Sequence, residues 1–595
     1  MSCARKSPRQ PRGFAGTVYG KPHYRLALSF LVVAGLTRAM PGAAQPMIPA
    51  PPGAIAPDIL PPAPSGPFGL PNPLTPPSAL PSGYIPASPQ QPADTLALPT
   101  PGAGITTLQQ YNPNAPAVLI NPTAAVGLNL YDNVNFTHSD RTAAAEVRLV
   151  PGISMSADTP RLQGVLSAQV SANAYTPTSN LDQIYANLYG NGHATILPDR
   201  LFVDAQSSIS QASTLPGLGF ISPSLLPRTQ QTQIFANSVS PYLRESYDGL
   251  VDTELRYRFG STNFSGNTTA TPSILTPTST NLSSGILNEG SFIAATGQNF
   301  ERALSRLTVD ASEFSSNSAS QNTQFNSYDD LQYRITPDIS ALGRIGYQNI
   351  RFPFAPEATF VGVTWLAGGR LAVGPNYGYI SLEYGRQQGV YGFTGSAAFQ
   401  VTPTISVSAN LVQGISSPGQ YALGSLATST LSANGSIVDQ YSGLPTAFYS
   451  PGLGLTNGVY RQHLFNGQVT DAIGPNSYSL YGYYENQQSL TPPITAPTKS
   501  IGAYASWRRD IRPDLNGYTS FGFSNTNNAV LVNSSTPING VNSFSANVGV
   551  NYLLARNLSG SVLYTLTYQP NGATLASGRG DIVANTLQFL LTKAF

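Results

Sequence analysis

The sequence predicts an all-β fold, a large transmembrane antiparallel up-and-down β-barrel. Three observations predict it: apolar and polar side chains alternate with a period of two, short and long connections alternate, and charge is scarce. Only 10% of the 595 residues are charged, against about 25% in typical soluble domains. Past the N-terminus no apolar run reaches the ~18 residues that a membrane helix needs. Low charge without long apolar runs is expected of a barrel.

Two segments precede the predicted barrel. Residues 1–44 read as a secretory signal peptide, because a basic region is followed by an apolar run at 26–36 and a small-residue cleavage site at 42–44. Residues 45–122 are proline-rich and nearly uncharged, which predicts a disordered linker that cannot bury a core. A short membrane anchor is the alternative for the first segment, and a tether or a lumen plug for the second. The barrel is predicted over 123–595.

Strand-like alternation begins at Val126 and continues to the C-terminus. The first run has its apolar residues on one parity: Val126, Leu128, Leu130, Val134 and Phe136. The pattern recurs in further runs at 162–174, 254–259, 544–552 and 558–568. Side chains of a strand alternate faces with this period, and counting such runs gives about 22 strands, within a range of about 16 to 24. Parity continues across Pro151-Gly152, which predicts a bulge or bend there and not a turn.

The connections between the predicted strands are of two kinds. Tight turns are predicted at 197–200, 336–339, 402–405, 512–515 and 555–558. Long connections rich in Ser, Thr, Asn, Gly and Pro are predicted at 211–230, 265–289, 415–457, 488–498, 526–540 and 570–582. All the long ones fall on one side, with the C-terminus at the short-turn edge. This phase is expected of outer-membrane barrels, which have short periplasmic turns and longer outer loops.

The apolar parity is predicted to face lipid, and the polar parity to line a lumen that can hold water. The charged residues of the lumen parity are Glu146, Arg148, Asp204, Glu254, Arg256, Arg258, Arg306, Asp310, Asp330, Arg334 and Arg344. Both signs occur at similar frequency, so no strong ion selectivity is expected. The alternative to a conducting role is that these charges pair with one another and stiffen the wall.

The last strand, Val583 to Phe595, has its apolar residues on the odd positions and ends on phenylalanine. It resembles the C-terminal signature strand of Gram-negative outer-membrane barrels, whose last residue is typically aromatic. The resemblance implies a barrel-assembly signal made of Leu587, Phe589, Leu591 and Phe595, with the barrel-assembly machinery as a partner. Lys593 departs from the pattern, which more often has a hydrophobic residue at that place.

The sequence predicts neither an enzyme nor a cofactor. Cys3 is the single cysteine and lies in the predicted signal peptide, which excludes disulfides and thiol catalysis from the mature chain. Three histidines lie outside the signal, without metal-ligand spacing: His138, His193 and His463. His193 has lumen parity beside Tyr189 and Asn191, where a hidden catalytic constellation is the alternative. A formal net charge of +2 argues against a nucleic-acid partner.

Two blocks of sequence carry a family resemblance. The first is Leu130 to Asn135, followed by Val150 to Ile153 and the strand Leu162 to Tyr175, and the second is Tyr328 to Tyr347. They resemble the PEP-CTERM system-associated outer-membrane protein family, found with exopolysaccharide export and protein-sorting loci. The resemblance implies an outer-membrane location and exopolysaccharide export components as partners. It implies no catalytic residues.

Three functions are compatible with these observations. The leading hypothesis is an outer-membrane barrel that serves exopolysaccharide or envelope export, as a pore or an accessory. A general porin or solute channel is the first alternative. A non-channel surface or adhesion barrel with functional outer loops is the second. Outer-membrane lipid surrounds the protein in all three, and the transported species and the oligomeric state stay open.

Overall fold

The computed structural model describes most of the chain from residue 117 onward. The described ranges are 117–213, 231–265, 284–297, 299–300, 302–316, 321–373, 378–431, 437–439, 458–491, 497–527, 540–555, 557–574 and 578–595. The predicted signal peptide, 1–44, and nearly all of the predicted linker, 45–122, lie outside these ranges. Within them, no helix is both long enough and apolar enough to cross a membrane.

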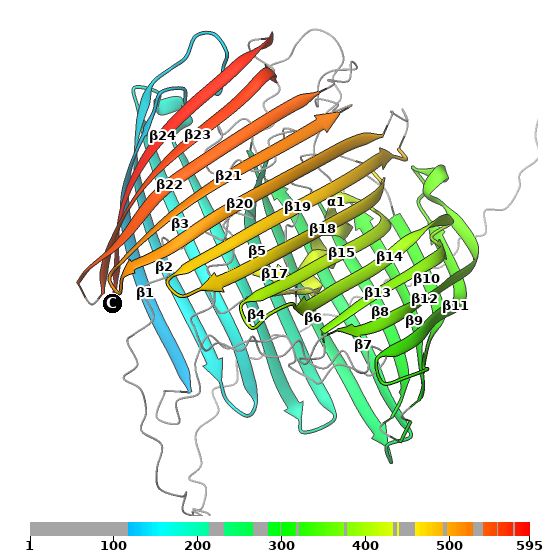
Figure 1. Cartoon of the computed structure of the whole chain (residues 1–595). Coiled ribbons are helices and arrows are strands. Elements are labelled where there is room, and N and C mark those ends of the chain that lie inside the picture. The colour runs from blue at the N-terminus through cyan, green and yellow to red at the C-terminus, as the bar shows by residue number, and fades with distance from the viewer. Residues whose placement is uncertain are drawn as a thin grey trace, which may run out of the picture. The chain divides into compact units, whose positions relative to one another are not determined.

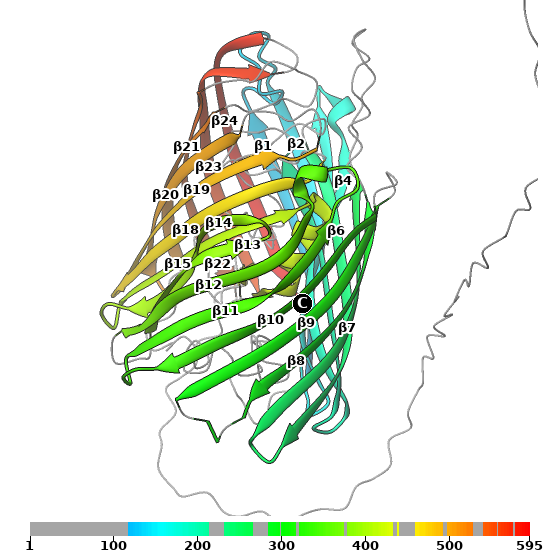
Figure 2. The same cartoon turned by 90° about the vertical axis from the view of Figure 1, so that its right-hand side faces the viewer.

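Twenty-two strands form one closed antiparallel sheet (Figures 1 and 2). The first eleven are β1 (Val118–Tyr131), β2 (Ala144–Asp158), β3 (Leu162–Thr176), β4 (Gln183–Leu197), β5 (Leu201–Ser213), β6 (Gln231–Tyr247), β7 (Val251–Ser265), β8 (Gly285–Thr296), β9 (Ala303–Ser316), β10 (Gln321–Arg334) and β11 (Ile339–Arg351). The other eleven are β12 (Phe360–Val373), β13 (Gly378–Gln387), β14 (Val390–Gln400), β15 (Ile405–Ser416), β18 (Tyr460–Ile473), β19 (Asn476–Ser489), β20 (Thr498–Arg512), β21 (Leu515–Asn527), β22 (Val541–Ala555), β23 (Leu558–Thr574) and β24 (Gly578–Ala594).

Each strand of the barrel pairs with the next one in sequence, and β24 pairs with β1 to close the circle. Thr123 lies opposite Ala594 in that closing pair, and the Phe595 N–H donates to the carbonyl of Pro122. A closed barrel satisfies its backbone within the sheet, which is the condition for crossing a bilayer with strands. The predicted fold and strand number are therefore confirmed.

The two faces of the sheet differ as the sequence predicts. On β7, the side chains of Leu255, Tyr257 and Phe259 are 56%, 49% and 43% exposed, whereas that of Glu254 is 4% exposed. The same contrast holds on β22, where Val548 and Val550 are 56% and 43% exposed. An apolar outer face that water would penalise is stable in lipid, so the exposed parity faces the bilayer.

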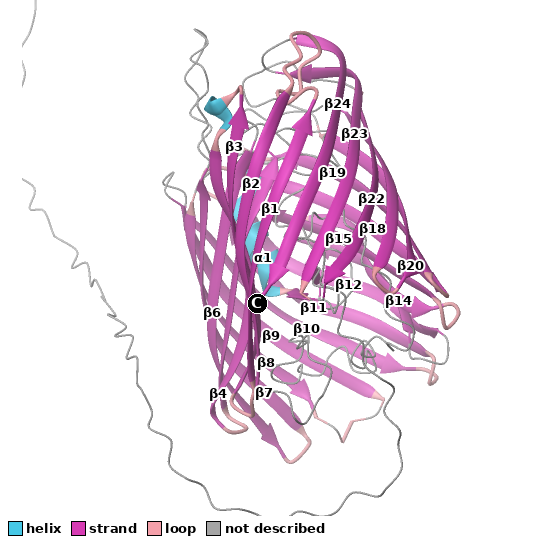
Figure 3. Ribbon diagram, turned by 90° about the vertical axis from the view of Figure 1, so that its left-hand side faces the viewer, coloured by secondary structure: helices cyan, strands magenta, loops and turns pink. Residues whose placement is uncertain are grey.

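Every connection of more than six residues between consecutive barrel strands lies at one end of the barrel (Figure 3), although that end also has short connections, such as the one between Gln387 and Val390. Thr336 and Thr402 begin two of the predicted short turns, and the hydroxyl of each accepts the N–H of the residue three positions later, at 3.0 Å. Side-chain bonds of this kind fix tight turns locally. The C-terminus lies at the short-turn end, which is the periplasmic end of an outer-membrane barrel.

Three local predictions are corrected. Val134 and Phe136 do not continue the first strand: β1 ends at Tyr131, and Phe136 has a φ of 52°, which breaks the extended pattern. The long connection at 570–582 is wrong, because β23 and β24 stay paired up to Thr574 and Gly578, with a register shift after Gln569. The strand β1 also begins at Val118, ahead of the predicted boundary at 123.

Pro151-Gly152 lies inside β2 and does not form a turn, as predicted, but it is not a bulge. Leu149 pairs with Ala172 and Gly152 with Gln169, so the register to β3 is the same on both sides. The ladder to β3 is interrupted at Val150 and Pro151 without an inserted residue. Proline has no N–H to donate, which accounts for the interruption.

Candidate functional site

A helix lies inside the barrel, which is unusual in a fold made of strands (Figures 1 and 3). This helix, α1 (Pro418–Ala427), follows β15 directly in the connection predicted at 415–457. Ser417 caps it: the Gln420 N–H donates to the Ser417 hydroxyl, and the Gln420 side chain accepts from the Ser417 N–H. Proline at the first helical position completes a standard helix start.

One face of α1 packs on an apolar patch of the inner wall. The cluster joins Ala422, Leu423, Leu426 and Ile437 to Val165, Tyr189, Ala212, Ile234, Ala236, Leu287 and Phe314. Leu423 and Leu426 are 1% and 0% exposed. Burying two leucines stabilises the docked helix by roughly 1.5–3 kcal/mol each. We call α1 and the strands β16 (Ser429–Leu431) and β17 (Ile437–Asp439) that follow it the inner arm.

The wall strands approach α1 closely because small residues lie at the contact. A Cβ on Gly419 would lie 2.6 Å from the Phe314 ring and 2.8 Å from the Thr262 hydroxyl. A Cβ on Gly260 would lie 3.1 Å from both methyl carbons of Leu423. The hydroxyl of Ser429, just past the helix, donates to the Tyr189 hydroxyl at 3.3 Å. Helix and wall are thus fitted to each other.

The other side of α1 reaches the opposite wall. Tyr421 has a side-chain hydrogen bond with Gln462 of β18. Burial raises the pKa of the Tyr421 hydroxyl well above its ordinary value, and the Glu485 carboxylate of β19 raises it further. In the order of the closed sheet, β18 and β19 lie across the barrel from β6 and β7. The helix therefore bridges two facing walls of the barrel.

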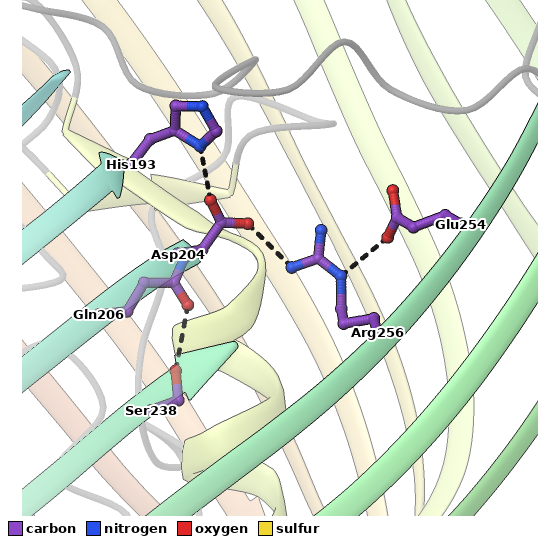
Figure 4. Close-up of polar contacts among 6 residues, drawn as sticks. All are labelled: His193, Asp204, Gln206, Ser238, Glu254 and Arg256. Carbon is purple, nitrogen blue, oxygen red and sulfur yellow. Dashed lines mark hydrogen bonds and ion pairs between the residues drawn. The ribbon is translucent and has the colours of Figure 1, made fainter. Parts of the chain in front are cut away.

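Below α1, charged residues of the inner wall form a connected network (Figure 4). His193 Nδ1 lies 2.8 Å from one oxygen of Asp204, and Arg256 donates to the other oxygen at 2.8 Å. Arg256 also donates to Glu254 at 2.8 Å and lies over the ring of Tyr242, 3.8 Å from its centroid. Arg256 of β7 thus reaches across Tyr242 of β6 to Asp204 of β5, and His193 of β4 joins the network through the same carboxylate.

A second network continues the first around the wall. Asp330 accepts from Arg306 at 3.1 Å and from Arg344 at 2.5 Å. Arg258 donates to Glu289. Asp310 accepts from the side-chain amide of Asn326 at 2.8 Å. These contacts extend over β7 to β11, and each arginine is matched by a carboxylate on a neighbouring strand.

The two networks together form a belt of charged side chains on the inner faces of β4 to β11. The remaining charged residues of the predicted lumen parity lie outside this belt. Glu146 is 1% exposed and accepts from Asn129 at 2.9 Å and from the Tyr131 hydroxyl. Arg148 donates to Ser171 at 3.0 Å. Arg334 ends β10 at the short-turn edge. All eleven predicted residues have inward parity, but they do not form a single site.

Leu587, Phe589 and Leu591 have outward parity on β24, and Phe595 follows directly after that strand. Phe589, Leu591 and Phe595 are 38%, 46% and 70% exposed. Lys593 shares this outward face. Their role as a barrel-assembly signal stays a prediction.

His193 is a member of the charge network through its contact with Asp204. Its ring is 4% exposed and stacks on Phe202, with 5.4 Å between ring centroids. Tyr189 instead accepts the hydrogen bond of Ser429. Within the described ranges no group of three His, Cys, Asp or Glu side chains is placed to hold a metal ion.

The inner arm and its apolar wall were not predicted, although the sequence holds a signal for both. Val165, Ile234 and Phe314 are apolar residues on the parity assigned to the lumen. Such residues indicate that protein covers the wall at these places. Ser417-Pro418-Gly419-Gln420 is a capping-box sequence inside the connection that was taken as a plain loop.

No family model and no curated protein matches the chain. Similar solved structures include the ferric-catecholate import receptor Fiu of E. coli K12, with 10% identity, a TM-score of 0.44 and coverage of 80% of this chain and 81% of that one. The ferric enterobactin receptor PfeA of Pseudomonas aeruginosa, as a mutant, has 10% identity, a TM-score of 0.40 and coverage of 80% of both chains. OpdQ of Pseudomonas aeruginosa has 9% identity, a TM-score of 0.32 and coverage of 81% and 99%.

The barrel itself defines the class of protein. A closed antiparallel sheet of 22 strands, with an apolar exterior, a polar interior and long loops at one end, is the architecture of Gram-negative outer-membrane barrels. The chain is an outer-membrane β-barrel.

Proposed function

We propose that the protein is a channel for small polar solutes across the outer membrane, and that it acts without catalysis. The observation that carries the proposal is the solvent exposure of the paired charges on the inner wall. The side chains of Asp204, Arg258 and Glu289 are 28%, 19% and 24% exposed, although each is in an ion pair. Charges that are paired and still accessible line a wet interior.

The wall chemistry favours a channel that selects by size more than by charge. The belt on β4 to β11 holds arginines and carboxylates in nearly equal number and in contact with one another, so its net field is weak. The inward face of β21 to β24 carries mostly uncharged hydroxyls and amides, including Ser520, Asn547, Thr565 and Gln588. Because α1 bridges the interior, the inner arm sets the width of the path, and pore width limits solute size.

The proposal is tested with the purified full-length barrel in planar bilayers and in solute-loaded liposomes. We expect a steady ohmic conductance with weak ion selectivity, and swelling rates that fall steeply as the sugar probe grows from a monosaccharide to a tetrasaccharide. A barrel that inserts, resists heat unfolding as outer-membrane barrels do, and conducts nothing under any condition contradicts the channel. That outcome would favour a non-channel surface protein.

A role in exopolysaccharide export is our second proposal, and the family resemblance of Leu130–Asn135 and Tyr328–Tyr347 is what supports it. A polymer in transit would require α1 to leave the two walls that it bridges. The two functions separate in a deletion strain. Loss of small-solute uptake with normal polysaccharide secretion favours the channel, and the reverse favours the export role.

A further inference from the structure

Among the strand pairs of the described barrel wall, β14 and β15 share the fewest paired positions. Only six positions of this pair are in register, from Gly395 opposite Leu411 down to Gln400 opposite Ser406. By comparison, β15 pairs with β18 along its whole length, from Ile405 to Ser416. The upper part of β14, Val390 to Thr394, therefore pairs with β13 alone.

Above the paired section, β15 passes behind β14. Gln413 and Ile415 lie on the same parity of β15 as Leu411, which is paired with the outward-facing Phe465 of β18. Both are nevertheless buried, at 8% and 5% exposed, whereas Val412 between them is 44% exposed. A Cβ on Gly392 would lie 2.0 Å from the Gln413 side-chain oxygen. The outer side of β15 thus packs on the inner side of β14, and the two edges overlap.

Side-chain amides and apolar residues fill the overlap in place of a ladder. The Ile415 N–H donates to the Gln388 side chain at 2.6 Å, and the Gln388 N–H donates to Gln348 at 2.8 Å. Ile415 also belongs to an apolar cluster with Ile350, Phe352, Ala355, Ala358, Val459 and Leu490. The Gln413 amide is the exception, since neither its nitrogen nor its oxygen has a hydrogen-bond partner.

The overlap lies at the depth of the outer leaflet. β14 has 11 residues, which span roughly 25–28 Å across the bilayer at the usual strand rise and tilt. The upper part of β14, which pairs with β13 but not with β15, therefore occupies the outer half of the hydrocarbon. Outside it lies an aromatic patch on β12 to β14 in which Trp365, Tyr384, Tyr391 and Phe393 are 39%, 43%, 57% and 53% exposed.

We propose that the β14–β15 overlap is a lateral opening that admits the acyl chain of an amphiphile from the outer leaflet. Open sheet edges are not stable in lipid, so the edges left without a partner strand need a cover, and the apolar cluster around Ile415 is a cover that a hydrocarbon chain can share. The buried amide of Gln413 supplies an unused donor and an unused acceptor for a head group. The inference is independent of the channel proposal.

The test is photo-crosslinking from a photoreactive residue at Val412, on the interior side of the overlap. The full-length barrel is reconstituted in dioleoylphosphatidylglycerol vesicles with labelled acyl chains. We expect label at position 412, label at the lipid-facing Phe589 as the positive control, and none at the inward-facing Gln588. Label at 412 no higher than at 588 overturns the proposal.

Two disulfide locks sharpen the test. The pair Gly392→Cys and Gln413→Cys closes the overlap, and the pair Ser396→Cys and Asn410→Cys joins residues that are already in register. We expect the first lock to reduce acyl labelling at 412 to the level of Gln588, and the second to leave it unchanged. Equal labelling in both locked proteins means that hydrocarbon reaches 412 by another route, which also overturns the proposal.

Discussion

The part of the inner wall that α1 covers and the inner wall of β21 to β24 are built on the same two-residue alternation, yet their inward side chains differ in kind. Where α1 packs on the wall they are apolar, as at Ile234 and Phe314, which are 0% and 2% exposed. On β21 to β24 they are hydroxyls and amides, such as Asn547, which donates to Ser520 at 3.1 Å. The comparison shows that the position of a residue in the alternation determines whether its side chain faces inward. Whether an inward side chain is apolar or polar depends on what lies against it, the helix α1 or the lumen.

The largest effect is expected from variants that detach α1 from the wall. Leu426→Asp or Leu423→Asp places a carboxylate in the apolar cluster, and loss of a buried leucine alone costs about 2–5 kcal/mol. We expect the inner arm to leave the wall and single-channel conductance to rise roughly two-fold or more, since the path widens. Planar-bilayer recording measures it.

The matched control for this prediction is Leu563→Asp. Leu563 lies on the inner face of β23, away from the apolar cluster, so the same change adds a lumenal charge without touching α1. Conductance that rises equally in the control and in Leu426→Asp would show that the added charge, and not the release of α1, is responsible.

The next largest effect is expected from substitutions that change the net charge of the belt. Asp330→Asn removes the carboxylate that pairs with both Arg306 and Arg344, so the interior becomes more positive and we expect a shift towards anion selectivity. Arg258→Gln leaves Glu289 without this partner and is expected to shift selectivity towards cations.

Reversal potentials in a KCl gradient measure both shifts. They are best resolved at low salt, because the screening length shrinks to about 10 Å at 0.1 M. Shifts of the same sign in the two variants would contradict a conduction path along the belt.

The smallest expected effect concerns the contact between the inner arm and the wall. Tyr189→Phe removes the hydroxyl that accepts from Ser429, and one such hydrogen bond is worth about 1 kcal/mol. We expect hydrogen exchange at the α1 amides to accelerate roughly five-fold. Tyr504→Phe, on the inner face of β20, serves as the control, and equal acceleration in both would argue against a specific contact.

The sequence alone was sufficient to predict the barrel, because the alternation of side chains that indicates each strand is a local pattern. Leu255, Tyr257 and Phe259 alternate with Glu254, Arg256 and Arg258 whatever the distant structure is, and each strand repeats the argument. Thr336-Pro337 and Thr402-Pro403 mark turns for an equally local reason. Strand ends were less predictable: the polar stretch 570–582 reads as a loop, yet its flanks remain paired.

The interior depends on contacts that are distant in sequence, which no local pattern reveals. The hydrogen bond between Ser429 and Tyr189 joins residues 240 positions apart. The charged residues could be assigned to the inner face, but their partners could not: Asp204 and Arg256 are 52 positions apart. The overlap of β14 and β15 was hidden for the same reason, because parity continues along β15 although its pairing with β14 stops after Leu411.

Cysteine accessibility tests the central claim, a closed barrel with a wet interior that α1 covers in part. In a Cys3→Ala background, single cysteines replace Gln588, Phe589 and Ile234, and the barrel in vesicles is treated with a charged, membrane-impermeant maleimide. We predict rapid reaction at 588, no reaction at 589, and reaction at 234 only when Leu426→Asp is also present. Rapid reaction at 589 with none at 588, or free reaction at 234 while α1 is intact, would contradict the account.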